Sequence, residues 1–72
     1  MKEERIKELE KLGDKLRTYR LEKNISQEKL AEMTDLDRTY ISGLERGKRN
    51  PSFLILKKLT VCLDICPNDL FN

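Results

Sequence analysis

The sequence contains no histidine and no tryptophan, and its only aromatic residues are two tyrosines and two phenylalanines. Cys62 and Cys66 stand four residues apart, and without histidine they cannot complete a tetrahedral zinc site within one subunit. We therefore expect neither a metal nor a cofactor. The two thiols are expected to lie reduced in or near the core, and the alternative is thiol redox sensing.

Long apolar runs are also missing. No run approaches the ~20 residues that span a bilayer, and the charged start Met1-Lys2-Glu3-Glu4-Arg5 is not followed by an apolar export segment. These absences predict a cytoplasmic protein without a membrane partner. The sequence also lacks a glycine-rich nucleotide loop, a carboxylate pair spaced for a cleft, and a nucleophile with a base. Nothing in the sequence therefore indicates an enzyme.

What the sequence does contain is charge and short helical patterns. Its 72 residues are 38% hydrophobic and 39% charged, which is typical of a compact helical domain rather than a disordered tail. Because runs of β-branched residues are few, we expect an all-α fold in a single domain over residues 1–72. A core of this size is marginal, so dimerisation would add stability.

The positive charge is concentrated in one part of the chain. Residues 38–58 hold six Lys/Arg and one Asp/Glu, whereas residues 1–37 hold nine and ten, and residues 59–72 hold only two aspartates. The overall net charge of +2 therefore conceals a local excess of +5. This asymmetry is expected of a surface that binds a polyanion.

Residues 26–47 have the pattern of two short helices joined by a tight turn. Ser26 can cap the first helix, Leu30 and Met33 give it one apolar face, and the turn falls at Thr34 and Asp35.

The second helix of this pair has an inner and an outer face. Asp37 can cap it, Ile41 and Leu44 point inward behind Leu36, and Gly47 can supply a left-handed stop. The opposite face then carries hydrogen-bond donors at Arg38, Thr39, Ser42 and Arg46. Such a stripe on a helix fits the DNA major groove, while the alternative is a solvated polar face.

This segment resembles the lambda-repressor-like (Cro/cI, or Xre) helix-turn-helix family. The resemblance rests on Ser26-Gln27-Glu28-Lys29-Leu30-Ala31 and on Tyr40-Ile41-Ser42-Gly43-Leu44-Glu45-Arg46-Gly47. It extends to Leu12-Gly13-Asp14-Lys15-Leu16-Arg17, Lys48-Arg49-Asn50-Pro51-Ser52 and Asn68-Asp69-Leu70-Phe71. It implies a five-helix domain whose second and third helices form the helix-turn-helix.

The resemblance also implies roles for individual residues. Base contacts fall on Arg38, Thr39 and Ser42, and Gln27 is expected to contact the DNA backbone and brace the recognition helix. Arg20 and Glu45 are expected to form a structural ion pair.

The remaining basic and polar residues near the second helix are assigned to phosphate. These contacts fall on Arg46, Lys48, Arg49 and Asn50. Two assignments stay open: Arg17 is either a phosphate contact or a solvated charge, and Tyr40 either a phosphate contact or a core-edge residue. Gly43 either lets the helix approach the DNA groove closely or relieves packing against another helix.

The N-terminal region, from about residue 3 to residue 23, has the pattern of an amphipathic helix. Its apolar residues recur at three- and four-residue steps at Ile6, Leu9, Leu12, Leu16 and Tyr19. Gly13 interrupts the pattern, since a glycine inside a helix costs ~1 kcal/mol relative to alanine. We therefore expect either one helix or two helices that meet near Gly13.

The C-terminal region, about residues 52–72, is predicted to hold two helices and the dimer contact. Ser52 caps the first, whose core stripe is Phe53, Leu56, Leu59 and Leu63, widened by Ile55 and Cys62. Pro67 suits the start of a short fifth helix. From the resemblance we assign the dimer interface to Ile65, Leu70 and Phe71, extended by Leu54 and Val61, where the family usually has polar residues.

The sequence therefore predicts a dimeric, sequence-specific transcriptional regulator that binds a palindromic operator in double-stranded DNA. Within the family it looks most like the controller proteins of bacterial restriction–modification systems. Phage repressors and antitoxins share the scaffold, and RNA polymerase is a further candidate partner. The alternative from another class is a protein-interaction module that retains the fold.

Overall fold

The computed structural model describes residues 2–71, and the expected all-α fold is confirmed because no strand occurs among them. The α-helices are α1 (Lys2–Glu22), α2 (Gln27–Thr34), α3 (Arg38–Glu45) and α4 (Phe53–Leu63). The predicted short fifth helix is not an α-helix. In its place lies a four-residue 3-10 helix, η1 (Pro67–Leu70), because the backbone closes here through hydrogen bonds between residues three apart: Asp69 N donates to Cys66 O and Phe71 N donates to Asn68 O.

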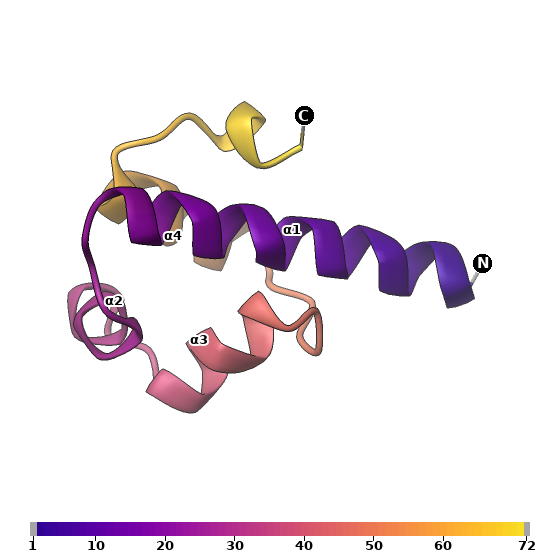
Figure 1. Ribbon diagram of the computed structural model, residues 1–72, viewed down its shortest axis with the longest axis horizontal. Coiled ribbons are helices and arrows are strands. Elements are labelled where there is room, and N and C mark those ends of the chain that lie inside the picture. Colours follow the sequence, from indigo (N-terminus) through magenta and orange to yellow (C-terminus); the bar gives the residue numbers. More distant parts are fainter. Residues whose placement is uncertain (1, 72) are drawn as a thin grey trace.

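Helix α1 runs along the long axis of the molecule (Figure 1). Helices α2 and α3 lie on one side of it and η1 on the other, and its N-terminal end projects beyond the other elements. The helix is continuous through Gly13, which settles the choice between one helix and two. Gly13 lies where α1 crosses the end of α3, and a Cβ there would clash with Leu44 O and stand 2.7 Å from Glu45 O.

Two of the predicted N-caps and the left-handed stop are confirmed. Ser26 Oγ accepts from Lys29 N at 2.9 Å, and Ser52 Oγ accepts from Ile55 N at 3.2 Å. Gly47 has φ +74°, a conformation that disfavours any side chain, and a Cβ there would also meet the backbone of Glu10. Asp37 does occupy the N-cap position of α3, but its side chain accepts no capping hydrogen bond.

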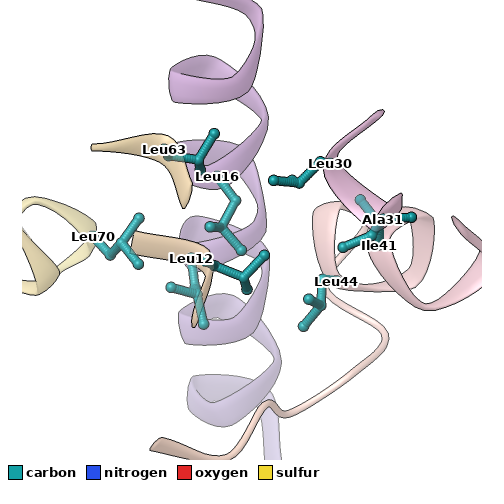
Figure 2. Close-up of a cluster of buried hydrophobic side chains, with 9 residues drawn as sticks. Leu12, Leu16, Leu30, Ala31, Ile41, Leu44, Leu63 and Leu70 are labelled. Atoms are coloured by element: carbon teal, nitrogen blue, oxygen red, sulfur yellow. The ribbon is translucent and has the colours of Figure 1, made fainter. Parts of the chain in front are cut away.

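The buried core joins all five elements. It consists of Leu12, Leu16, Leu30, Ala31, Ile41, Leu44, Leu59, Leu63 and Leu70 (Figure 2). Phe53, predicted to belong to the core, is 73% exposed because it is the first residue of α4 and precedes the turns that reach the interior. Ile6 and Met33 are also exposed, and Ile6 lies on the projecting end of α1.

Replacing Gly13 with alanine is predicted to destabilise the fold. The new methyl group meets backbone carbonyls of α3, which cannot move aside as a side chain can, so the overpacking cost of ~1–3 kcal/mol should exceed the gain in helix propensity of ~1 kcal/mol. Urea unfolding followed by circular dichroism measures the difference. Lys11→Ala, on an exposed position of the same helix, is the control and should not lower stability; a Gly13→Ala variant as stable as that control would contradict the packing argument.

Candidate nucleic-acid interface

Helices α2 and α3 meet at a turn that the backbone closes tightly. Leu36 N donates to Ala31 O at 2.9 Å, and Asp35 lies in the left-handed region with φ 58°. The buried Thr34 hydroxyl donates to Leu30 O at 2.7 Å, so Thr34 ends α2 rather than forming the turn, and its role is structural. This turn fixes the direction in which α3 leaves α2.

The two faces of α3 separate as the spacing predicts. Ile41 and Leu44 are buried, whereas Arg38, Thr39 and Arg46 are exposed. Ser42 is half-buried, and its carbonyl oxygen accepts from Arg46 Nε at 3.3 Å. Helix α3 therefore exposes hydrogen-bond donors on one side, while buried residues hold its other side against the core.

Arg38 has one neighbour that sequence reasoning missed. Its Nε lies 4.0 Å from Glu28 Oε1 on α2, and both side chains are more than half exposed. An exposed pair of this kind contributes little to stability, so the guanidinium can exchange Glu28 for another acceptor. The pairing joins two helices across the turn, so no local sequence pattern could have indicated it.

A buried ion pair anchors α3 to α1, as predicted. Arg20 Nε donates to Glu45 Oε2 at 2.6 Å and Arg20 Nη2 to Glu45 Oε1 at 3.0 Å, in a bidentate arrangement with side chains only 8% and 4% exposed. Arg20 Nη1 also donates to Ile25 O at 2.7 Å. Gln27 Nε2 donates to Glu45 Oε1 at 3.1 Å, which confirms that Gln27 braces α3. Its contact with a DNA backbone stays a prediction.

The loop after α3 is positioned by the helix it leaves. Arg49 Cζ lies 5.7 Å from the centre of the Tyr40 ring, in a cation–π contact. The aliphatic part of Arg49 covers Gly43, where a Cβ would stand 3.0 Å from Arg49 Cγ. The packing interpretation of Gly43 named another helix, whereas the observed neighbour is a loop side chain, and close approach to a DNA groove stays a prediction. Tyr40 packs partly buried against the core, as the core-edge interpretation expects, and a phosphate contact from its hydroxyl stays a prediction.

The other predicted phosphate contacts are exposed. Lys48 and Asn50 lie in the loop between α3 and α4, where Lys48 N donates to Gly43 O at 2.8 Å. Arg17 is exposed on α1 and does not belong to this loop. Arg46, Lys48, Arg49 and Asn50 are thus all exposed in the segment that directly follows α3, and each phosphate contact stays a prediction.

The residues assigned to the dimer interface differ in exposure. Leu54 and Val61 are 72% and 71% exposed on α4, Phe71 is 64% exposed, and Ile65 is half-buried. Leu70 is only 3% exposed, because it turns inward from η1 and fills the core of its own protomer. Its assignment to the interface is therefore wrong.

The cysteines and the charged groups form no evident metal site. Cys62 is half-buried with Sγ 3.5 Å from Met33 O, and Cys66 is exposed at the start of η1. Within residues 2–71, no three His, Cys, Asp or Glu side chains gather in a way that could hold a metal ion. In the same part of the chain no helix combines the length and apolarity needed to cross a membrane.

Comparisons with known proteins agree on one family. A family profile described as helix-turn-helix matches residues 16–69. The control protein C.BamHI of Bacillus amyloliquefaciens is 51% identical over 61 residues, which cover 83% of this chain and 75% of that protein.

Two solved structures show the same fold. The restriction–modification controller protein C.AhdI of Aeromonas hydrophila aligns with a TM-score of 0.85 and 49% identity over 88% of this chain and 96% of that one. The controller protein C.Esp1396I, solved as a tetramer in complex with its natural 35 base-pair operator, aligns with a TM-score of 0.79 and 39% identity over 89% and 84%.

Breaking the buried ion pair from one side should be strongly destabilising. Arg20→Ala leaves the Glu45 carboxylate buried without its cation, and the expected loss is ~3–5 kcal/mol of unfolding free energy, measured by urea denaturation. The double variant Arg20→Met with Glu45→Leu removes both charges and should recover much of the loss. A single variant that loses less than ~1 kcal/mol would show that the pair is not needed for the fold.

Proposed function

The chain belongs to the helix-turn-helix family, and on that premise we propose that it is a sequence-specific DNA-binding regulator of transcription. One observation carries the proposal: α3 is held from behind by the Arg20–Glu45 pair while its donor-bearing face stays exposed beside a basic loop. A helix of this size fits the major groove, and a fixed helix can align its donors with base edges before contact.

The base contacts are proposed to come from the first half of α3. Arg38 can pair bidentately with the O6 and N7 of a guanine, and Thr39 can offer its hydroxyl to a base or its methyl to thymine. Ser42, one turn further along, reads the next position or a phosphate. Glu28 competes for Arg38 in the free protein, so the guanidinium is available but not rigidly held.

The phosphate contacts are proposed to fix the register of α3 in the groove. Gln27 lies at the start of α2, where free N–H groups also face outward, and the loop supplies Lys48, Arg49 and Asn50. Arg46, Tyr40 and Arg17 complete the set. Because Arg49 rests on Tyr40 and Gly43, its guanidinium loses less side-chain freedom on binding than a free arginine would.

We further propose that the protein binds as a homodimer to a palindromic operator. The exposed apolar residues Leu54, Val61 and Phe71, with Ile65 beside them, are the candidates for the contact. A two-fold dimer presents two α3 helices about one turn of DNA apart. Oligomerisation on DNA is a stated property of the relative C.Esp1396I, which was solved as a tetramer on its operator.

The narrower proposal is control of a restriction–modification system. It is supported by C.BamHI, a control protein, and C.AhdI, a restriction–modification controller protein. Each alignment covers most of this chain and most of the relative. A phage-type repressor, an antitoxin and a protein-interaction module are the alternatives on this fold. A cytoplasmic location, the absence of catalysis and a contact with RNA polymerase accompany the proposal as predictions.

The first test is selection of bound duplexes from a random DNA pool at roughly 150 mM salt, which suppresses non-specific binding. We expect a palindrome with guanine steps, and we expect Arg38→Ala to relax the preference at those steps by ~1–3 kcal/mol. Arg5→Ala, on the projecting end of α1, is the matched control and should keep the full motif. If no motif is recovered and binding disappears as salt rises, the interaction module becomes the better explanation.

Phosphate contacts are tested by the salt dependence of operator binding. Arg49→Ala should reduce the slope of log Kobs against log salt by ~0.9 and weaken all sequences about equally. Tyr40→Leu removes the ring beneath Arg49 and should weaken binding too, whereas Tyr40→Phe keeps the ring.

Lys23→Ala removes an exposed charge that has no assigned contact, and it serves as the control for Arg49→Ala. Its slope should match that of the unmodified protein. Equal slopes for Arg49→Ala and Lys23→Ala would remove Arg49 from the phosphate contacts.

A further inference from the structure

The residue at the tip of α3 carries a carboxylate that the fold does not use. Asp37 holds the N-cap position of α3, yet its side chain accepts no capping hydrogen bond, whereas Ser26 and Ser52 cap α2 and α4. Within residues 2–71 the Asp37 carboxylate has no hydrogen bond and no ion pair, and the residue is exposed. Because the capping hydrogen bond is the main contribution of an N-cap aspartate to stability, the fold does not account for this side chain.

The backbone of Asp37 is nevertheless held in place. Asp37 O accepts from Tyr40 N at 3.0 Å and from Ile41 N at 3.1 Å, and Ile41 is buried in the core. The preceding residue, Leu36, is tied to α2 by the hydrogen bond from its backbone N–H to Ala31 O. An unpaired side chain on a fixed backbone can meet a ligand without a large loss of chain entropy.

The tip of α3 is also the part of the helix that base edges would meet. In helix-turn-helix proteins the N-terminal residues of the recognition helix contact the bases, and Asp37 directly precedes Arg38 and Thr39, the proposed base contacts. An N-cap residue stands at the end of its helix rather than on one of its faces. If α3 binds as proposed, the carboxylate of Asp37 therefore enters the major groove beside Arg38.

A carboxylate in the major groove selects bases by their hydrogen-bonding groups. It can only accept hydrogen bonds, and the donors in this groove are the N4 amino group of cytosine and the N6 amino group of adenine. Guanine O6 and N7, thymine O4 and the phosphate oxygens are all acceptors, which a carboxylate repels. Cytosine is favoured over adenine, because adenine places the acceptor N7 beside its amino group and cytosine has no acceptor in this groove.

The negative charge also distinguishes base edges from the DNA backbone. The free N–H groups at the start of a helix attract phosphate, and α3 begins with an arginine, which attracts phosphate as well. The carboxylate of Asp37 at the same tip opposes a phosphate there. Asp37 and Arg38 together therefore require a donor and an acceptor on neighbouring bases, and a phosphate group offers only acceptors.

We propose that Asp37 is a specificity-determining residue, whose carboxylate accepts a hydrogen bond from the N4 amino group of a cytosine next to the guanine that Arg38 contacts. This role rests on the DNA binding of the proposed function and adds one base position to each half-site. It gives the uncapped carboxylate a purpose, because a side chain engaged in capping α3 could not offer the same lone pairs to a base.

The experiment is selection of bound duplexes at roughly 150 mM salt with the full chain and three variants. Asp37→Ser leaves a residue that is preferred at an N-cap but is too short to reach a base, so the preference for cytosine should fall roughly tenfold. Asp37→Asn offers an amide that pairs with both N6 and N7 of adenine, so the preference should move from cytosine to adenine.

Asp35→Asn is the matched control. It removes the same charge from an exposed residue in the turn between α2 and α3, and asparagine tolerates the left-handed φ of 58° found there. Its selected motif should equal that of the unmodified protein. Circular dichroism confirms that each variant is folded.

The outcomes separate this inference from the proposed function. A motif without cytosine beside the guanine steps overturns the role of Asp37 and leaves sequence-specific binding in place, and so does an unchanged cytosine preference in both Asp37 variants. An equal change in Asp35→Asn overturns it too, because loss of charge would then explain the effect. If the unmodified protein selects no motif, the proposed function fails together with this role.

Discussion

The bidentate contact between Arg20 and Glu45 is the interaction on which the rest of the structure depends. It joins α1 to the last residue of α3, and the same two side chains also bind the Ile25 carbonyl and the Gln27 amide. Three helices and the turn between α1 and α2 therefore meet at one ion pair. Because both charges are buried, any displacement of α3 would leave a charge without a partner, and the orientation of the exposed face is fixed by that cost.

Steric closeness between backbones reinforces this anchor. Gly13 lets α1 touch the carbonyls that end α3, and Gly47 lets the following loop pass against Glu10 of α1. The loop then returns over α3, where Arg49 lies on Gly43 and Tyr40. Helix α1 thus positions both α3 and the basic loop, although the proposed base contacts all lie on α3.

The features that could be predicted are those that depend on residue type and spacing within one segment of the chain. The caps at Ser26 and Ser52 and the two faces of α3 follow from residue type and helical spacing. The family resemblance supplied the Arg20–Glu45 pair. Periodicity failed where a helix runs past the core, since it cannot show that Phe53 and Ile6 lie beyond the packed turns. The family resemblance failed at Leu70, which it assigned to the dimer interface although the side chain faces inward. The contacts of Arg38 with Glu28 and of Arg49 with Gly43 depend on tertiary placement, which spacing does not encode.

If α3 reads the operator as we propose, its short length makes dimerisation a condition for specificity. Three side chains on eight residues can discriminate only a few base pairs, each by ~1–3 kcal/mol, so one subunit cannot separate an operator from the many competing sites in a genome. Doubling the contacts through a two-fold dimer adds the discrimination of both half-sites, and it ties occupancy to the monomer–dimer equilibrium. In the function that we propose, the fixed α3 sets which sequence is bound, and the dimer contact sets the protein concentration at which binding begins.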